Sequence, residues 1–201
     1  AEALLPRRRS AYSRLARWPG NIGIVVVNTV VLRLVVPTAA VGLALTAEAG
    51  GWGLLNMVDL PLWLEVGIAV VVLDGVIYLQ HVMVHAVPAF WRLHRMHHAD
   101  QDFDVTTGAR FHPFEILLSM VIKLAAVAAL GPPALGLLLF EVLLNATSMF
   151  NHGNLKLPVA LDRVVRLIIV TPDMHRVHHS TNLTEANTNF GFNLPWWDRL
   201  F

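Results

Sequence analysis

Long apolar segments are the feature of this sequence that most constrains its fold. Four stretches are apolar over most of their length, namely residues 22–47, 59–85, 116–130 and 134–150. A helix needs about 20 apolar residues to cross the hydrocarbon layer of a bilayer, so the last two stretches are short for a full crossing. Hydrophobic residues make up 55% of the chain and charged residues 14%, which is too apolar for an ordinary soluble domain. We predict an all-α integral membrane protein with about four transmembrane helices.

Local signals and charges predict how these segments are arranged. Asp59 and Pro61 are typical of a helix start, and the prolines after Gly131 favour a tight hairpin between the last two spans. The basic segment 1–20 precedes the first span, and basic flanks favour the cytoplasm. We expect the first span to be retained, because it is longer than the apolar part of a signal peptide and shows no clean cleavage site. An even number of spans returns the chain to the cytoplasm near residue 151.

We expect a single membrane domain over residues 1–201 with both termini and the active site in the cytoplasm. Its expected parts are a basic cytoplasmic N-terminus (1–20), transmembrane helices (22–150) with a cytoplasmic loop (90–113), and a cytoplasmic helical cap (151–201).

Charged residues within these parts lead to further expectations. The alternating Asp100, Asp102 and Asp104 are typical of a solvated loop. Lys123 and Glu141 lie inside spans, where charge is costly, so we expect them to face protein or each other. The chain has no Cys, which excludes disulfides, thiolate zinc sites and iron–sulfur clusters. The net charge is +1, and we expect no nucleic-acid partner.

Histidines gather in two short runs, 94–98 and 175–179, both with the spacing His-x-x-His-His. Positions i, i+3 and i+4 of a helix lie on one face, so such a run can aim two or three imidazoles at a single point. Imidazole is the commonest side-chain metal ligand, and one tetrahedral zinc would use at most four. The number of histidines therefore favours two metal ions, and the predicted topology places all of them on one side of the membrane. The candidate ligands are His81, His85, His94, His97, His98, His152, His175, His178 and His179.

Other polar residues lie close to these candidates in the sequence. Asp74 and Tyr78 share a helical stripe with His81 and His85, which indicates either support for the histidines or a polar seam between helices. His112 could be a further ligand or a hydrogen-bond partner of one. Two residues flank candidate ligands and could support them through hydrogen bonds: Asn151 and Asp173.

The order of these motifs resembles the fatty acid hydroxylase/sterol desaturase superfamily of membrane di-iron enzymes. The resemblance runs from about residue 74 to the C-terminus. Its motifs are Asp74…Tyr78…His81-x-x-x-His85, Trp91-x-x-His94-Arg95-Met96-His97-His98, Arg110-Phe111-His112-Pro113-x-Glu115, Asn151-His152-Gly153-Asn154, Thr171-Pro172-Asp173-Met174-His175-Arg176-Val177-His178-His179-Ser180, Asn189-Phe190-Gly191 and Trp197-Asp198-Arg199-Leu200-Phe201.

The resemblance implies a function and its requirements. It implies a helical membrane fold whose cytoplasmic cap holds two iron ions, which zinc can replace in a purified sample. It also implies O2-dependent hydroxylation or desaturation of a membrane lipid, with a fatty acyl or sterol-like chain as substrate. The nine candidate histidines match family ligands, and the role of His112 stays open. Val82 departs from the Arg that many relatives carry there, and the family usually continues past the position of Phe201 with a Gly-Thr pair.

Electron supply and rival functions follow from the same pattern. The sequence shows no fused cytochrome domain, so we expect a separate electron donor of cytochrome or ferredoxin type. A zinc-dependent membrane hydrolase would use fewer histidines and a nearby Glu base in a His-Glu-x-x-His motif, which the sequence lacks. A non-enzymatic metal-binding membrane protein would spread its ligands across the membrane. The sequence does not decide between hydroxylation and desaturation.

Overall fold

The computed structural model describes residues 2–37 and 39–201, and in these residues it is helical throughout apart from turns, loops and one isolated β-bridge. The predicted all-α class is confirmed. The helices are α1 (Arg14–Val35), α2 (Ala39–Gly50), η1 (Leu55–Met57), α3 (Leu62–Ala86), α4 (Pro88–His98), η2 (Thr107–Ala109), α5 (Pro113–Leu130), α6 (Ala134–Asn151), α7 (Val159–Val165), α8 (Pro172–His178), α9 (Leu183–Ala186) and α10 (Trp197–Leu200).

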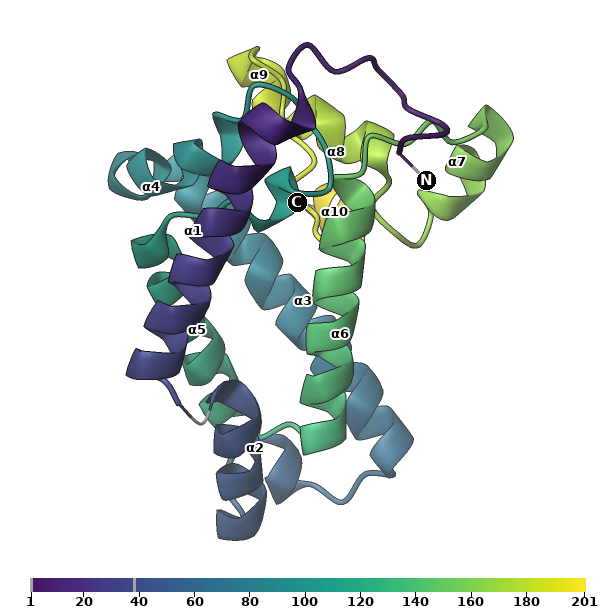
Figure 1. Ribbon diagram of the computed structural model, residues 1–201. Helices are drawn as coiled ribbons and strands as arrows, with labels where there is room; N and C mark the ends of the chain where they lie inside the picture. Colours follow the sequence, from purple (N-terminus) through teal and green to yellow (C-terminus); the bar gives the residue numbers. More distant parts are fainter. Residues whose placement is uncertain (1, 38) are drawn as a thin grey trace.

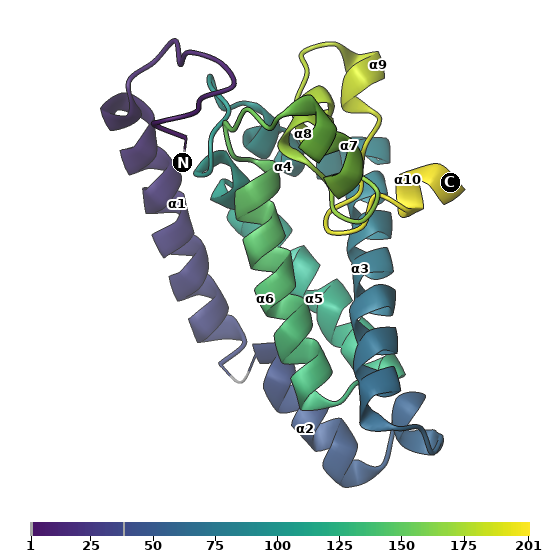
Figure 2. The same cartoon turned by 90° about the vertical axis from the view of Figure 1, so that its right-hand side faces the viewer.

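The long helices form a bundle, and the short ones form a cap at one end of it. Figures 1 and 2 show α1, α3, α5 and α6 running lengthwise, with α2 at the end opposite α8 and α9. The four apolar stretches predicted from the sequence are found as helical segments long and apolar enough to cross a membrane. Apolar side chains such as Val26, Val30, Leu138 and Val142 are exposed on this bundle, as expected for a surface that faces lipid. The protein is a multi-pass membrane protein.

The first predicted span, residues 22–47, is two helices rather than one. α1 ends at Val35 and α2 begins at Ala39, with Pro37 between them. Proline has no N–H to donate and disfavours helical backbone in the preceding residue, so the helix stops before it. α1 also begins earlier than predicted, at Arg14, where the Ser13 side chain accepts a hydrogen bond from the Ala16 N–H. Part of the basic segment 1–20 is therefore helical.

The core of the bundle lies between α3, α5 and α6. Leu73, Leu137 and Phe140 are almost completely buried there. α3 and α6 approach closely because Gly136 has no side chain: a Cβ at this position would lie 3.1 Å from the Cβ of Ala69. The hairpin between α5 and α6 turns at Gly131, whose φ of +59° favours glycine.

An ion pair between a buried lysine and a half-buried glutamate joins α5 to α6 inside the bundle. Lys123 Nζ donates to Glu141 Oε1 at 2.7 Å. This contact confirms the expectation that the two charges face each other. It satisfies both groups where water is scarce, since an isolated charge between membrane helices would be costly.

The segment predicted as a cytoplasmic loop, residues 90–113, differs from the expectation in two ways. Its first part belongs to α4. The prediction that its aspartates are solvated is wrong for Asp100 and Asp104, whose side chains are 2% and 4% exposed. Arg17 of α1 donates to both carboxylates, at 2.7 Å and 2.8 Å respectively. Arg17 thereby ties the segment after α4 to the first helix, and this long-range partner is not visible in the local sequence.

Candidate metal centre

The first histidine run and the pair before it lie on two consecutive helices. His81 and His85 are four residues apart near the end of α3, so their rings lie on one face. α3 ends at Ala86 and α4 begins at Pro88, where the missing N–H of proline costs no hydrogen bond. The histidines carried by α4 are His94, His97 and His98.

The second run lies on α8, and a single histidine ends α6. Thr171 is the N-cap residue of α8 and Pro172 its first residue. His152 is the C-cap residue of α6, at the cap end of the bundle. The histidines of α8 and its C-cap are His175, His178 and His179.

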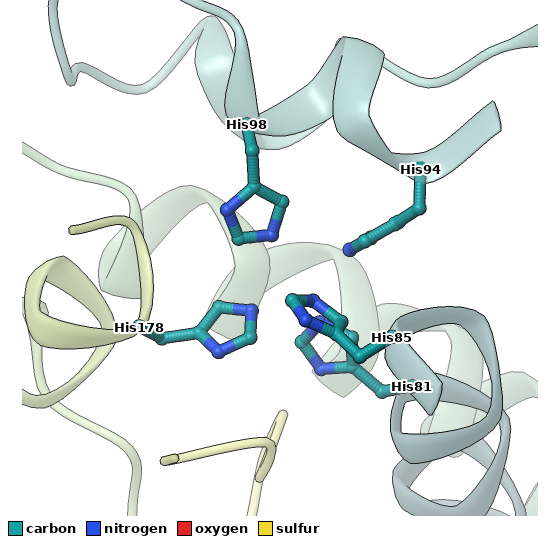
Figure 3. A group of neighbouring side chains, drawn as sticks. All are labelled: His81, His85, His94, His98 and His178. Carbon is teal, nitrogen blue, oxygen red and sulfur yellow. The ribbon is translucent and has the colours of Figure 1, made fainter. Parts of the chain in front are cut away.

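Five of these rings form a first group. Their ligand nitrogens all lie within 4.8 Å of one another, and Figure 3 shows the rings converging from α3, α4 and α8 on one point. The Nε2 atoms of all five are buried and have no hydrogen-bond partner among the residues that the structure describes. The group consists of His81, His85, His94, His98 and His178.

The other four rings form a second group, His97, His152, His175 and His179, with ligand atoms equally close together. Nε2 of His152 lies 3.1 Å from Nε2 of His97 and 3.0 Å from Nε2 of His175. A neutral imidazole has only one N–H, so several ring nitrogens that meet in a buried space are mainly lone pairs facing one another. Such an arrangement is unfavourable unless a cation lies between them.

Each histidine run is divided between the two groups. From the first run, His94 and His98 join the first group and His97 joins the second. From the second run, His175 and His179 join the second group and His178 joins the first. Successive residues are about 100° apart around a helix, so positions i and i+4 point together while i+3 diverges from i+4. A run therefore aims two rings at one point and its third ring at the other.

Hydrogen bonds at Nδ1 fix the orientation of several rings. Nδ1 of His81 donates to Phe190 O at 2.8 Å, and Nδ1 of His178 donates to Thr188 O at 2.9 Å. Nδ1 of His152 donates to Ser148 O at 2.8 Å. Because a carbonyl can only accept, the proton of these rings is on Nδ1, which leaves the Nε2 lone pair free to bind a metal.

A buried carboxylate orients a further ring of the first group. Glu115, in the first turn of α5, lies with Oε1 2.6 Å from Nδ1 of His94. The side chains of both residues are at most 5% exposed. A ligating histidine that donates to a carboxylate becomes a more basic ligand and is held in one tautomer. Glu115 therefore positions His94.

Burial also sets the charge of the rings outside the membrane-spanning helices. It lowers the pKa of His94, His97, His175, His178 and His179 well below the ordinary value of 6.5, and neighbouring imidazoles lower it further. Burial likewise lowers the pKa of His152 to about 4. These imidazoles are therefore neutral at pH 7, which is the form that binds metal.

The two groups fit two metal ions. Ligands at a right angle, each about 2.1 Å from one ion, have their nitrogens about 3.0 Å apart, close to the spacing within the second group. In the first group, five unpartnered Nε2 atoms face one space. Imidazole donors suit iron, zinc, copper and nickel.

An apolar cavity of about 410 Å³ leads to this centre from within the bundle. His81, His94 and His97 line it at the cap end, so it touches ligands of both groups. Deeper in the bundle, its walls include apolar side chains and the Lys123–Glu141 pair. Its volume lies within the range of small-molecule sites.

The remaining predicted site residues lie outside the two groups. His112 is the N-cap residue of α5, where its Nδ1 accepts a hydrogen bond from the Phe114 N–H at 3.2 Å. Asn151 donates to Phe192 O at 3.1 Å, and Asp173 accepts from Arg7 Nε at 3.0 Å. Their hydrogen bonds connect cap segments to one another rather than to a candidate ligand.

Asp74 and Tyr78 contact the C-terminal segment. Asp74 is fully buried and accepts hydrogen bonds from the backbone N–H groups of Asn193 and Leu194, both at 3.2 Å, and from Trp197 Nε1 at 2.8 Å. The Tyr78 ring stacks on Phe201, with centroids 6.1 Å apart. This segment follows directly on the Phe190 carbonyl that orients His81, so Asp74 acts on the histidines only through the chain that it anchors.

Sequence reasoning assigned no role to Glu115 or to the carbonyls of Thr188 and Phe190. Glu115 had a signal, because it follows His112 in a His-Pro-x-Glu motif at a predicted helix start. The carbonyls had none, since any residue type supplies one.

Comparison with known proteins agrees with this geometry. The sequence pattern of the family described as Fatty acid hydroxylase matches residues 66–201, which is more than half of the chain and includes all nine ligand candidates. The chain belongs to the fatty acid hydroxylase family. The match begins within α3, so α1, α2 and the segment before them precede the part that defines this family.

The names of two curated relatives describe enzymes that act on lipids. Ornithine lipid hydroxylase OlsE of Rhizobium tropici is 31% identical over 141 residues, which are 70% of this chain and 41% of that protein. Alkylglycerol monooxygenase of Homo sapiens is 28% identical over 130 residues, which are 62% of this chain and 27% of that protein. The chain thus spans less than half the length of these curated relatives. No solved structure matches it significantly.

Proposed function

We propose that this protein is an O2-dependent di-iron oxidoreductase that hydroxylates an alkyl carbon of a membrane lipid. The observation that carries the proposal is the meeting of two groups of imidazoles at the head of an apolar cavity inside a membrane bundle. The named activities of the relatives favour hydroxylation over desaturation.

The nine histidines would hold two irons, which supply the oxygen activation and electron storage that no side chain provides. Hydroxylation consumes one O2, two electrons and two protons, and it gives the alcohol and one water. The protein's own part is to position ligands and substrate. Glu115 and the carbonyls of Thr188 and Phe190 hold three rings in their binding tautomer.

The cavity binds and orients the substrate chain. Ile77, Val84, Ile116 and Phe192 line it and give an alkyl chain an apolar wall that excludes water. His81, His94 and His97 line the cap end of this cavity, so a substrate carbon at that end lies beside ligands of both groups. The chain enters from the bundle, where the surrounding medium is lipid.

A zinc hydrolase is less consistent with these contacts. It would use one zinc with at most four protein ligands, whereas nine histidines meet here in two groups. A metal transporter would need ligands along a path through the bundle, whereas the histidines of both groups lie at its cap end.

The central test is metal content and product formation in purified protein. Protein produced with iron should contain two irons per chain, and His97→Ala and His178→Ala should each lose iron and turnover. His112→Asn is the matched control, since His112 lies outside both groups and Asn also caps helices. Lipid extracts from cells with and without the protein should differ by hydroxylated species. Full iron content and activity in both alanine variants would contradict the ligand assignment, and one zinc with hydrolysed lipid would favour the hydrolase.

We also propose that the cap faces the cytoplasm. The segment before α1 and the first turns of α1 lie at the cap end of the bundle. They carry five arginines, and basic residues beside a membrane span favour the cytoplasmic side. These are Arg7, Arg8, Arg9, Arg14 and Arg17. The absence of native Cys permits a direct test. Ser10→Cys in intact cells should resist a membrane-impermeant thiol reagent and react after lysis. Labelling in intact cells would contradict the orientation.

A further inference from the structure

The short helix α7 packs on the cap with its polar side inward. Its acidic residue, Asp162, is 7% exposed and pairs with Arg166. The apolar side chains of α7 and of the turn after it are 50–67% exposed instead. A helix on the surface of a water-soluble domain shows the opposite arrangement, with apolar side chains inward. The apolar face of α7 consists of Val159, Leu161, Val164, Leu167 and Ile168.

These five residues form one continuous surface. Backbone hydrogen bonds continue the helical path of α7 through the turn as far as Ile169. Successive residues are about 100° apart around such a helix, so Leu161, Val164 and Ile168 lie in one stripe. Asp162 lies on roughly the opposite side, which is the side that the cap buries.

The position of α7 places this surface beside the membrane. Figure 1 shows α7 beyond the outline of the bundle at its cap end, next to the end of α6. Figure 2, which is turned by 90°, shows α7 in front of the bundle at the same level. Lipid surrounds the bundle up to this end. A helix that projects sideways here therefore lies over lipid.

The segment that carries α7 has an excess of positive charge. Residues 152–170 contain three basic residues and one acidic residue, Asp162, which Arg166 neutralises. The other two basic residues, Lys156 and Arg163, are exposed, and neither has a carboxylate within 4.0 Å in the described chain. The apolar face of α7 is thus flanked by two uncompensated cations.

The end of α7 is bonded to the C-terminal segment. Leu167 O accepts a hydrogen bond from Trp196 Nε1 at 2.8 Å, and Arg166 O accepts one from Arg199 Nη2 at 2.7 Å. The Asp198 carboxylate between these two side chains accepts from the backbone N–H groups of residues 190 and 191. It therefore fixes the backbone beside the Phe190 carbonyl that orients His81.

This part of the cap holds four of the nine candidate ligands, His152 and the three of the second run. No helix long enough to span a membrane follows α6 in the described chain. The second run begins shortly after α7, because Val170 directly precedes the N-cap residue of α8. A lipid contact at α7 would therefore tether this part of the cap to the bilayer.

We propose that α7 is an interfacial anchor that seats the cap on an anionic lipid leaflet. Its apolar face lies at the boundary between headgroups and acyl chains, and Lys156 and Arg163 contact the negatively charged headgroups. A helix with an apolar face and basic flanks binds a lipid surface in this way. The inference goes beyond the proposed function and does not depend on it.

A second copy of the chain is a less suitable partner for this face. A helix of seven residues is about 10 Å long, so its face is much smaller than the roughly 800 Å² per partner that a stable protein interface buries. In a symmetric dimer the same patch would also meet itself, which would bring the cations of both copies together.

The test measures the surroundings of single fluorescent labels on the full chain in nanodiscs that contain phosphatidylglycerol. The chain has no native Cys, so Val164→Cys and Ile168→Cys can each carry one nitrobenzoxadiazole label. Quenching by doxyl-labelled lipid reports contact with the bilayer, and quenching by iodide reports contact with water. The reference positions are Val142→Cys on the lipid-facing surface of α6 and Thr184→Cys, which is exposed on α9. Both α7 labels should resemble Val142→Cys, with lipid quenching at least about threefold stronger than at Thr184→Cys and iodide quenching correspondingly weaker.

A second measurement tests the headgroup contact. Lys156→Glu with Arg163→Glu should lower lipid quenching of the Ile168→Cys label about twofold or more in phosphatidylglycerol, and change it less in phosphatidylcholine. Arg9→Glu with Arg92→Glu is the matched control, because it changes the net charge equally. Both of its residues are exposed, lie outside residues 152–170 and form no ion pair in the described chain. It should leave the quenching nearly unchanged.

Three results would overturn the proposal. Iodide quenching of both α7 labels as strong as at Thr184→Cys would place the face in water. Protection from both quenchers would show that protein covers it, either a second copy or another segment. Equal effects of the two charge variants would refute the headgroup contact. None of these readouts depends on metal or turnover, so failure of the anchor would leave the proposed oxygenase function standing, and the reverse also holds.

Discussion

The contact between Glu115 and His94 allows a quantitative prediction about metal affinity. The 2.6 Å distance and the burial of both side chains make it a short hydrogen bond shielded from water. Loss of such a carboxylate partner typically lowers metal affinity about 10- to 100-fold, which corresponds to about 1.4–2.7 kcal/mol. Because His94 belongs to the first group only, Glu115→Leu should weaken the binding of one of the two metal ions and leave the binding of the other nearly unchanged. Glu115→Gln keeps an acceptor oxygen and should have a smaller effect.

The assay is competition for iron with a chelator of known affinity, with metal per chain measured at each step. Wild-type protein and Glu115→Leu should lose one ion at similar chelator concentrations and the other at clearly different ones. Asn187→Ala provides a matched control. Its Oδ1 lies 3.4 Å from Nδ1 of His85 at an exposed position, so this bond is weak and its loss should change affinity less than about threefold. If Glu115→Leu retained both ions as tightly as wild type, the orienting role of the carboxylate would be refuted.

Three further predictions concern stability. Asp74→Leu should cost about 3 kcal/mol, because three N–H donors lose their buried acceptor, and an unchanged unfolding midpoint would contradict this. Lys123→Met should lower the unfolding midpoint by leaving Glu141 unpaired, whereas Lys123→Met with Glu141→Leu should restore most of the loss; equal losses would mean that the pair is not coupled. The third concerns pH: burial alone would raise the pKa of Asp104, but hydrogen bonds, including one from Arg17, outweigh it and hold the pKa below 3.8. The resulting stability is present above about pH 4 and is lost as pH falls through the lowered pKa, so denaturation profiles in acid should be flatter for Arg17→Met than for wild type.

Local sequence patterns were sufficient to predict the class of fold and which histidines come together. Apolar length predicts the spans, since a helix must satisfy its own backbone in lipid. The spacing in the two histidine runs predicts convergence, because it matches the helical repeat, and the structure gathers all nine candidates into two groups. The break at Pro37 was missed because the apolar stretch continues on both sides of it, although the proline itself was a usable signal.

Partners far apart in the chain could not be predicted in this way. Asp100 and Asp104 looked solvated because their neighbours in sequence are polar, but Arg17 reaches them from α1. Glu115 lies 21 residues from His94 and meets it only because α5 returns beside α4. The carbonyls of Thr188 and Phe190 carry no side-chain signature at all.

Hydropathy and helical period are local properties of a polypeptide, so the amino-acid sequence was enough to predict several membrane spans and a gathering of imidazoles at one end of them. The helical period divides each histidine run, but the packing of α4 against α8 sets which rings meet, so that His178 joins His94 and His98 while His97 joins His175 and His179. The reason is geometric. The direction of each ring depends on where its helix is anchored by distant residues, such as Asp74 for the C-terminal segment and Arg17 for the segment after α4.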